Sequence, residues 1–324
     1  GLWGSLIEDV SLRMDLWGWL FGDGSLGMTL WGWLFGDGSW GWLDHSQCRD
    51  EIEVIAGDVR DRDSVAKVVK NIDVVFHLAA LIAIPYSYNA PLSYVHTNIE
   101  GTVNVLQSAR QEGAERGIHT STSEVYGTAR YVPIDEEHPL QGQSPYSASK
   151  IGADKLAEAF HLSFGLPITI VRPFNAYGPR QSARAVIPTI ISQALSGTEI
   201  RLGDLSPTRD FNYVSDIVDG FILAAECGEA VGQTINIGSG TEISIGDLAA
   251  TILRLVGKED IPITQCEDRV RPPQSEVKRL LADNRKALEI LGWSPHYALN
   301  DGLGLTIEWI RNNIDMYRVG TYAI

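Results

Sequence analysis

Apolar residues from residue 51 onward follow two alternating patterns. Residues 51–56 alternate between polar and apolar side chains, which predicts a half-buried strand, and residues 73–80 form the continuous apolar run of a buried strand. The apolar positions of residues 61–70 have helical spacing. The same criteria predict further helices at 97–111 and 147–164 and further strands at 117–121 and 167–172. Strands that alternate with helices predict an α/β fold with a doubly wound parallel sheet.

The chain changes character after Arg172, where proline and glycine turns become frequent and the elements become shorter. This pattern predicts a smaller C-terminal lobe that closes over a crevice at the carboxyl ends of the strands. We therefore expect residues 1–172, together with a returning segment of about residues 212–240, to form the sheet domain. Residues 173–211 and 241–324 are expected to form the smaller lobe.

The first 42 residues differ from the rest because they hold seven of the nine tryptophans. A near-perfect repeat of 14 residues begins at Met14 and again at Met28. Each copy contains a GxGxxG pattern, but neither has the preceding β-branched strand and the following amphipathic helix that a phosphate-binding loop requires. A glycine-rich irregular segment is therefore the favoured interpretation of residues 1–38. Acidic residues interrupt the apolar runs, so no segment reaches transmembrane length.

The charge of the chain disfavours two classes of partner, and its cysteines and histidines argue against disulfide and metal sites. With 26 basic and 41 acidic residues the net charge is −15, which disfavours nucleic acid and anionic membrane surfaces. Cys48, Cys227 and Cys266 form no CxxC pair, which argues against a disulfide scaffold or a zinc site and favours a reduced, cytoplasmic setting. His77 has no second ligand at metal spacing and is expected to be a buried histidine, so no metal is predicted.

The strongest chemical signal is the segment Tyr146-Ser-Ala-Ser-Lys150, which places a phenol and an ammonium four residues apart on one face of a predicted helix. A nearby ammonium stabilises a phenolate and lowers the pKa of a tyrosine, so Tyr146 is a candidate base near neutral pH. By itself this spacing is common on helix surfaces. It gains weight from Thr122-Ser123-Glu124, which lies upstream at the end of a predicted strand.

From about Ser39 to the C-terminus, the sequence resembles the extended short-chain dehydrogenase/reductases that act as nucleotide-sugar epimerases and dehydratases. The resemblance rests on ordered matches: Gly57-Asp58-Val59, His77-Leu-Ala-Ala80, Asn98, Thr122-Ser-Glu124, Tyr146 with Lys150, and residues 172–179, 209–214, 236–239 and 291–295. Residues 39–44 and 119–181 most resemble 4,6-dehydratases that act on nucleotide-linked N-acetylglucosamine in legionaminic-type sugar pathways. The family implies a Rossmann-like dinucleotide-binding domain with NAD as cofactor and a smaller lobe that binds the nucleotide-diphosphate sugar.

The resemblance also implies roles for the central residues. Tyr146 takes the proton of the C4 hydroxyl while NAD⁺ receives the C4 hydride, Thr122 hydrogen-bonds the same hydroxyl, and Lys150 holds the nicotinamide ribose and tunes the tyrosine. Glu124 then removes the C5 proton, water leaves from C6, and the hydride returns to C6, so NAD is not consumed. Epimerases of the family typically have a small or apolar residue in place of Glu124, which therefore favours a 4,6-dehydratase.

Ser123 departs from the glucose dehydratases of the family, which commonly have an aspartate there to protonate the departing water. A serine hydroxyl is a poor acid, so we expect Glu124 to donate the proton that it has collected, or a water molecule to relay it. The alternative interpretation of Glu124 is a solvated carboxylate at a strand end.

Further site residues follow from the same resemblance. The expected cofactor contacts are Asp58, Val59, Leu78, Ala79, Ala80, Asn98, Tyr146 and Lys150. The expected substrate contacts are Asn175, Arg180, Arg209 and Arg271, because guanidinium groups bind a diphosphate through paired hydrogen bonds. The alternatives are a turn aspartate for Asp58, a helix cap for Asn98 and surface salt bridges for the arginines.

The family begins with a strand, a GxxGxxG turn and a helix whose amides bind pyrophosphate, and residues 1–38 do not match that pattern. We expect this segment not to reproduce the glycine-loop contacts, and NAD to bind weakly or not at all. The favoured interpretation is a 4,6-dehydratase, a lyase. The alternatives are a nucleotide-sugar 4-epimerase and an inactive, folded family member without the dinucleotide loop. The family also implies a homodimer formed through the two long helices.

Overall fold

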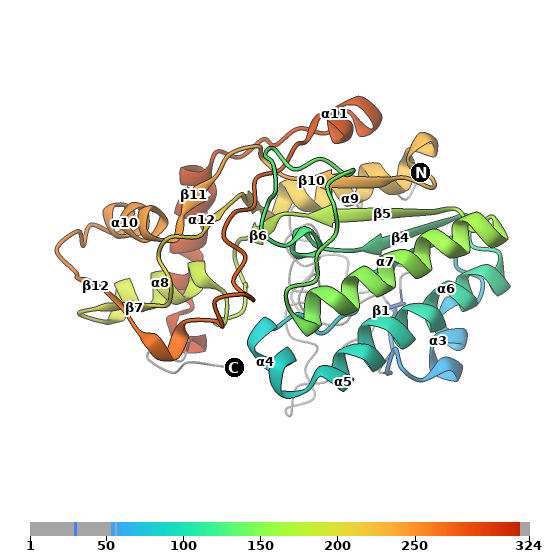
Figure 1. The fold of residues 1–324 in the computed structure, drawn as a ribbon, viewed down its shortest axis with the longest axis horizontal. Helices are drawn as coiled ribbons and strands as arrows, with labels where there is room; N and C mark the ends of the chain where they lie inside the picture. Colours follow the sequence, from blue (N-terminus) through green and yellow to red (C-terminus); the bar gives the residue numbers. More distant parts are fainter. Residues whose placement is uncertain (1–28, 31–52, 56, 318–324) are drawn as a thin grey trace.

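A four-stranded parallel sheet lies at the centre of the computed structural model, which describes residues 29–30, 53–55 and 57–317 (Figure 1). Ile170 lies opposite His119 on one side and opposite Thr234 on the other. Because parallel strands end at one edge of a sheet, the segments that follow them meet there. The strands, in spatial order, are β10 (Thr234–Ile237), β5 (Ile168–Pro173), β4 (Arg116–Thr120) and β3 (Val74–His77).

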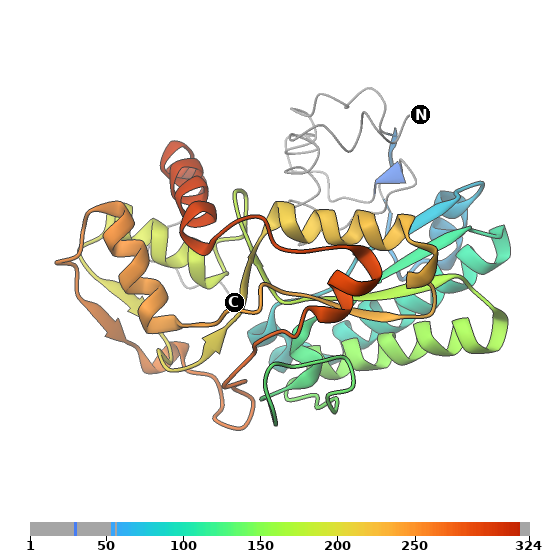
Figure 2. The same cartoon turned by 90° about the horizontal axis from the view of Figure 1, so that it is seen from above.

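Two layers of helices cover the sheet, one on each face (Figures 1 and 2). On one face Leu106 and Ala157 pack with Ile168, and on the other Phe221 packs with Ile118. This arrangement confirms the predicted doubly wound α/β fold. None of the described helices is long and apolar enough to cross a membrane. The first layer contains α3 (Arg62–Val69), α6 (Gly101–Glu112) and α7 (Pro145–Phe164), and the second contains α9 (Val214–Glu226) and α11 (Arg285–Leu291).

Short elements connect these layers. β1 (Thr29–Leu30) pairs in parallel with β2 (Glu53–Val54), which lies within the strand predicted at 51–56. Apart from Thr29 and Leu30, the tryptophan-rich repeat lies outside the described residues, and so do both GxGxxG patterns. The other short elements are α4 (Ile84–Asn89), α5 (Pro91–Tyr94), the π-helical turn η3 (Val95–Glu100), and the 3-10 turns η4 (Ser123–Tyr126), η5 (Gly228–Ala230), η6 (Glu267–Arg269) and η7 (Ile314–Met316).

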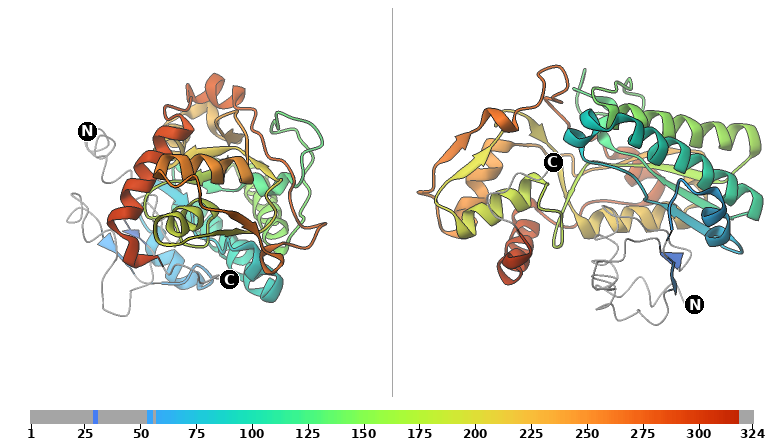
Figure 3. Two further views of the ribbon diagram at one scale, coloured as in Figure 1. Left: turned by 90° about the vertical axis from the view of Figure 1, so that its left-hand side faces the viewer. Right: turned by 90° about the horizontal axis from the view of Figure 1, so that it is seen from below.

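Beyond β5 the chain builds a smaller lobe beside the sheet (Figure 3). Its core joins Ile191, Leu248 and Ile307, one from each of its helices. The division into two domains stays a prediction; α11 and Trp293, expected in this lobe, pack with the core of the sheet instead. The elements of the lobe are the strand pairs β6 (Asn175–Tyr177) with β9 (Phe211–Tyr213), β7 (Ile200–Leu202) with β12 (Ile263–Gln265) and β8 (Thr208–Arg209) with β11 (Ile243–Ser244), and the helices α8 (Val186–Ser196), α10 (Ile245–Val256) and α12 (Leu299–Asn312).

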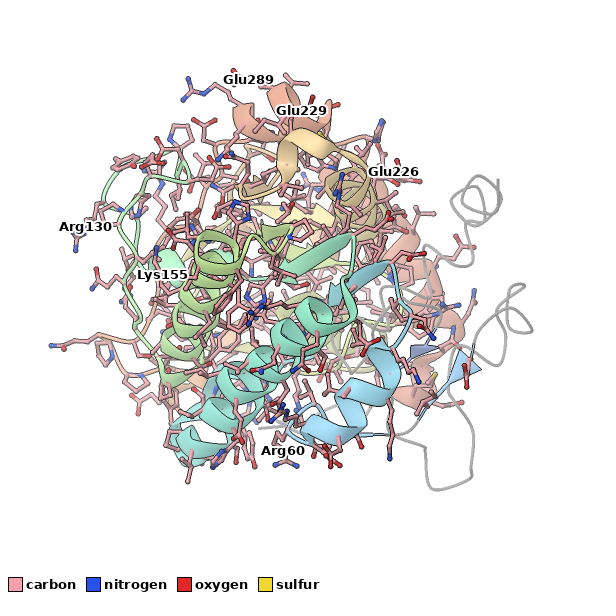
Figure 4. The ribbon with its side chains drawn as sticks, turned by 90° about the vertical axis from the view of Figure 1, so that its right-hand side faces the viewer. Arg60, Arg130, Lys155, Glu226, Glu229 and Glu289 are labelled. Carbon is pink, nitrogen blue, oxygen red and sulfur yellow. The ribbon has the colours of Figure 1, made fainter. Side chains whose placement is uncertain are left out.

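The helix α7 carries both Tyr146 and Lys150, and its sequence sets its ends. The Ser144 side chain accepts a hydrogen bond from the backbone of the first turn, and a proline takes the first helical position. Gly165 follows the last turn with a φ of 69°, the left-handed conformation that ends many helices. Lys155 projects outward from α7 (Figure 4), whereas Lys150 is buried. The two lysines therefore mark the solvent face and the core face of one helix.

Candidate active site

The carboxyl end of β4 carries the segment Thr122-Ser123-Glu124. The chain leaves β4 at Thr120 and turns into η4, where the Thr122 hydroxyl accepts a hydrogen bond from the backbone N–H of Glu124 at 3.2 Å. Ser123 and Glu124 are both buried, so the interpretation of Glu124 as a solvated carboxylate is wrong. The turn fixes this carboxylate at the edge of the sheet where ligands bind in open α/β folds.

Tyr146 lies against this segment. Its phenol group lies near the Thr122 hydroxyl, which acts on its pKa, and its ring meets Tyr94 edge-on at a centroid distance of 6.2 Å. Burial raises the pKa of Tyr146; the Thr122 hydroxyl lowers it, and the charge of Glu124 raises it. The prediction that Lys150 lowers the pKa of Tyr146 is wrong for this structure, because desolvation of the phenolate outweighs the favourable contacts.

Lys150 lies one helical turn beyond Tyr146 and is 3% exposed. Its ammonium donates a hydrogen bond to the carbonyl oxygen of Thr120. Burial lowers the pKa of Lys150 to about 8, although the charge of Asp154 raises it. The buried hydroxyl of Thr120 has no hydrogen-bond partner within the described part of the chain. Because an ammonium has three donors, Lys150 and Thr120 together can offer hydrogen bonds to a ligand.

Asn98 ties the loop after β3 to α7. Its Oδ1 accepts a hydrogen bond from the backbone N–H of Leu81 at 2.8 Å, and its Nδ2 donates to the Leu81 carbonyl and to the Ser149 hydroxyl, both at 2.9 Å. Since these three bonds use both amide hydrogens and tie the oxygen to Leu81, Asn98 shapes the loop. It lies inside η3, so the helix-cap interpretation is wrong. The same loop holds the expected cofactor contacts Leu78, Ala79 and Ala80.

Asp58 and Val59 lie in the turn before α3. The Asp58 carboxylate accepts hydrogen bonds from the backbone N–H of Arg60 at 2.8 Å and from its Nε at 2.9 Å. The side-chain hydrogen bond from Arg60 lowers the pKa of Asp58. Val59 is buried against Gly101, where a Cβ atom would lie only 2.9 Å from the valine side chain. The structure therefore gives Asp58 the contacts of a turn aspartate and gives Val59 a packing role.

Two of the expected substrate contacts, Arg209 and Arg271, meet at the carboxylate of Glu276. Nη2 of Arg209 and Nη1 of Arg271 lie 3.3 and 3.5 Å from the same Glu276 oxygen. Burial lowers the pKa of Arg209, whereas the charges of Glu124 and Glu276 raise it. Glu124 is therefore close enough to Arg209 for their charges to interact, and the arginine cluster lies beside the η4 segment. The interpretation of Arg209 as a surface residue is wrong, because its side chain is buried.

The other two expected substrate contacts lie in the stretch of chain after β5: Asn175 at the start of β6 and Arg180 in the turn that follows β6. Asn175 begins β6, and its buried Oδ1 has no partner within the described residues. Arg180 has a φ of 68°, a left-handed conformation that is uncommon outside glycine and frequent at functional sites. Both side chains are half-buried. Their position after a central strand places them at the same edge of the sheet as Thr122.

Three residues beside the site had received no role from the sequence: Asp154, Arg172 and Glu276. Asp154 lies four residues after Lys150 on α7, so the helical spacing offered a signal for it. Glu276 lies outside regular secondary structure and is 67 residues from Arg209 in sequence, so no local pattern pointed to it.

A second cluster of polar groups lies between α9 and the segment before α12. Asp216, Asp219 and His296 could place ligand atoms within 4.8 Å of one another, a grouping that the sequence spacing did not reveal. The Asp216 oxygens accept hydrogen bonds from the backbone N–H groups of His296 and Tyr297, each at 3.1 Å. Asp216 thus fastens this segment to α9.

Comparisons with known proteins agree with this geometry. The family model described as GDP-mannose 4,6 dehydratase matches residues 38–306. A UDP-glucose 4-epimerase from Mycolicibacterium smegmatis is 34% identical over 83% of this chain and 86% of its own. A dTDP-glucose 4,6-dehydratase from Streptomyces antibioticus is 32% identical over 81% of this chain and 77% of its own.

The solved structures that resemble this chain include enzymes of the same two activities. A dTDP-glucose 4,6-dehydratase from Streptomyces venezuelae, solved with NAD bound, has a TM-score of 0.81 at 29% identity over 97% of this chain and 96% of its own. A UDP-N-acetylglucosamine 4-epimerase from Methanobrevibacter ruminantium has a TM-score of 0.79 at 30% identity over 88% and 90%. The chain therefore belongs to the GDP-mannose 4,6 dehydratase family, within the extended short-chain dehydrogenase/reductases, whose members here include both nucleotide-sugar 4,6-dehydratases and 4-epimerases.

Proposed function

We propose that the protein is a nucleotide-sugar 4,6-dehydratase that uses NAD and converts a nucleotide-linked N-acetylglucosamine to a 4-keto-6-deoxy sugar. The observation that carries this proposal is the buried Glu124 carboxylate, whose charge acts directly on Tyr146. A 4-epimerase moves a hydride at C4 only. A dehydratase must also remove the C5 proton and expel the C6 hydroxyl, and a positioned carboxylate is suited to that proton transfer.

Tyr146, Thr122 and Glu124 divide the proton transfers among them. Tyr146 is a neutral phenol in this structure, because burial raises its pKa. The positive charge of the oxidised nicotinamide, when NAD is bound, would favour the phenolate, which takes the proton of the C4 hydroxyl, and the neighbouring Thr122 orients that hydroxyl. Glu124 removes the C5 proton and returns it to the departing C6 oxygen, because the neighbouring Ser123 hydroxyl is a poor acid. NAD, when bound, supplies the hydride acceptor for C4 and the hydride donor for C6. A proton from solvent then adds to C5 as the hydride adds to C6, and the proton held by Tyr146 returns to solvent. The net change is the loss of one water from the sugar.

The residues at the end of β4 fit a nicotinamide ribose. Lys150 donates one hydrogen bond, to the Thr120 carbonyl, and retains donors for ribose hydroxyls. The buried Thr120 hydroxyl, which has no partner among the described residues, adds a second polar atom at the same place. The related dTDP-glucose 4,6-dehydratases solved with NAD support this assignment.

The arginine cluster suits the diphosphate of the substrate. Arg209 and Arg271 share a single carboxylate, so two guanidinium groups face one Glu276 charge. The guanidinium donors that Glu276 does not occupy can bind a phosphate through paired hydrogen bonds. Asn175 and Arg180, which lie at the same edge of the sheet, are the further contacts that we propose.

A 4-epimerase is the second candidate, and Ser123 favours it because a serine is a poor acid for the departing water. The test is to incubate the protein with UDP-, GDP- and dTDP-linked N-acetylglucosamine and to analyse the products by mass spectrometry. A dehydratase gives a product that has lost one water, whereas an epimerase gives an isomer of unchanged mass. An isomer without any dehydrated product would overturn the proposal.

The third candidate is an inactive family member that binds no NAD, and the composition of residues 1–38 supports it. Calorimetry with NAD⁺ compares the present chain with a chimera that carries an ordinary family N-terminus. If NAD binds only to the chimera, the present chain lacks the cofactor site. Micromolar or tighter binding by the present chain, with no gain in the chimera, excludes this candidate.

We also propose a homodimer. Exposed apolar side chains on α5, η3 and α7 support it, because large apolar groups on adjacent helices favour a protein partner. Light scattering in solution measures the mass directly, and a monomer at micromolar concentration would contradict the proposal. The exposed side chains are Leu92, Val95, Leu162 and Phe164.

A further inference from the structure

The buried Asp154 carboxylate lies one helical turn after Lys150 and takes no part in the chemistry proposed above. Its Oδ1 lies 3.2 Å from His119 Nε2, which must be the donor because an ionised carboxylate only accepts. Its Oδ2 accepts a hydrogen bond from the Ser121 hydroxyl at 2.7 Å, and two more from Nε and Nη2 of Arg172 at 3.1 and 3.0 Å. Three side chains from two strands therefore converge on one carboxylate.

Two of these donors lie on either side of the residue to which Lys150 is hydrogen-bonded. His119 and Ser121 stand on either side of Thr120, whose carbonyl accepts the hydrogen bond from Lys150. Asp154 and Lys150 thus fasten the same helix to three consecutive residues at the end of β4. The next residue along the chain is Thr122, so the attachment sets the start of the η4 segment.

Arg172 extends the contact to the far end of η4. Its Nη1 donates a hydrogen bond to the Tyr126 hydroxyl at 3.0 Å, and its guanidinium lies 5.0 Å from the centre of the Tyr126 ring. Tyr126 ends η4, the turn that carries Glu124, and its hydroxyl donates to Asn236 Oδ1 at 2.7 Å. The ion pair between Asp154 and Arg172 therefore holds both ends of this turn.

The charges around Lys150 give Asp154 a second effect. His77 on β3 and His119 on β4 face the ammonium, and burial lowers the pKa of both, so neither carries a charge at neutral pH. Arg172 on β5 is a cation, and Tyr146 on the same helix is neutral. Among the described residues that face Lys150, Asp154 is the group whose charge favours the ammonium. Burial alone raises the pKa of Asp154, but the hydrogen bond from His119 and the charge of Arg172 keep the carboxyl group ionised.

We propose that Asp154 is a positioning residue: it supplies the counter-charge that keeps Lys150 an ammonium, and it fixes α7 to the strand end that carries Thr122 and Glu124. Its effect on the reaction rests on the proposed function, because that function gives Lys150 and Glu124 their roles. Its effect on the charge of Lys150 is measurable in the protein without any ligand.

The test is the titration of Lys150 in Asp154→Asn, which keeps the size of the side chain and removes its charge. The protein is labelled with ¹³C-lysine, and Lys150→Met identifies the signal. We expect the midpoint of Lys150 to fall by about one pH unit or more, because a neighbouring opposite charge shifts a pKa by about one to three units. Lys155, exposed on the same helix, is the internal reference. The seven lysines are Lys67, Lys70, Lys150, Lys155, Lys258, Lys278 and Lys286.

Turnover supplies the second measurement. The high-pH limb of kcat/KM, expected near pH 8 in the unmodified protein, should move to lower pH by the same amount in Asp154→Asn. The matched control is Asp216→Asn, which removes a buried carboxylate that binds backbone amides in another part of the fold. We expect Asp216→Asn to lower thermal stability. It should leave unchanged both the titration midpoint of Lys150 and the pH at which kcat/KM falls on the alkaline side.

A second variant keeps the test decisive if Asp154→Asn does not fold. Asp154→Asn combined with Arg172→Gln removes both charges of the ion pair, which is better tolerated than the removal of one partner, and the Lys150 midpoint should still lie below that of the unmodified protein. An unchanged midpoint, or a lowered midpoint with an unmoved limb, would overturn the proposal. A lowered midpoint in a chain that neither dehydrates nor epimerises its substrates would support the counter-charge and contradict the proposed function.

Discussion

The two charged clusters beside the proposed site differ in how they are held. Around Asp154, hydrogen bonds of 2.7 to 3.2 Å join α7 to β4 and β5, and every side chain involved is buried. Around Glu276, the contacts to Arg209 and Arg271 are 3.3 and 3.5 Å, and the Arg271 side chain is 30% exposed. The difference matches the two tasks that we propose for this site. Proton transfer needs fixed distances, whereas a diphosphate must enter and leave.

The Tyr146→Phe variant, on the helix that the Asp154 cluster holds in place, should have the largest effect. It removes the oxygen that takes the C4 proton, so we expect kcat/KM to fall by about 10³-fold or more and no absorbance of reduced nicotinamide in a single turnover. Tyr94→Phe, on the ring that packs against Tyr146, is the matched control and should lose less than about tenfold. Activity within tenfold of the unmodified protein in Tyr146→Phe would identify another base.

Glu124→Gln separates the dehydration from the oxidation at C4. We expect the 4-keto-6-deoxy product to fall by about 10²- to 10³-fold, because the carboxylate that takes the C5 proton is gone. Oxidation at C4 should remain detectable as absorbance of reduced nicotinamide in a single turnover. Solvent deuterium at C5, read by mass spectrometry, should disappear together with the product. Unchanged product formation would remove Glu124 from the mechanism.

Lys150→Met tests whether the buried ammonium beside the Asp154 cluster costs stability. Because the pKa of Lys150 is about 8 in the folded protein and near 10.5 when unfolded, the unfolded chain binds the proton more tightly. The free energy of unfolding therefore rises with pH between these values. Below pH 8 the folded protein carries the full free-energy cost of keeping the Lys150 charge buried. Lys150→Met should raise the free energy of unfolding at pH 7 by about 1 to 3 kcal/mol and flatten this pH dependence.

Denaturant melts across that pH range measure the effect. The control is Lys155→Met on the exposed side of α7, which should change stability by less than about 0.5 kcal/mol. A loss of stability in Lys150→Met alone would mean that the hydrogen bond to Thr120 outweighs the burial of the charge.

Arg271→Gln tests the looser cluster and should have the smallest effect. We expect KM for the nucleotide sugar to rise by about tenfold while kcat stays within about twofold, because a charge contact to the diphosphate contributes to binding before the chemical step. Arg279→Gln, which breaks an exposed ion pair with Glu242, is the control and should leave KM unchanged. A loss in kcat with an unchanged KM would move Arg271 from binding to catalysis.

The sequence predicted the sheet and the shared helical face of Tyr146 and Lys150 well, because both depend on local signals. The apolar runs at 73–80 and 167–172 marked central strands, and the spacing of Tyr146 and Lys150 marked one helical face. The direction of the Tyr146 pKa could not be predicted, since it depends on burial by Tyr94 and on Glu124. The pairing of Arg209 with Glu276 could not be predicted either, because it joins residues 67 positions apart.

The Asp154 carboxylate accepts four hydrogen bonds, and this affects which substitutions the protein tolerates at the residues around it. Each of its three partner side chains is buried, so replacing one alone leaves a polar group without a partner, at a cost of about 1 to 3 kcal/mol. A replacement at one of these positions therefore favours a compensating replacement at a partner. Across divergent relatives Asp154, Arg172, His119 and Ser121 are expected to covary, and a library randomised at all four should be enriched in paired exchanges over single ones.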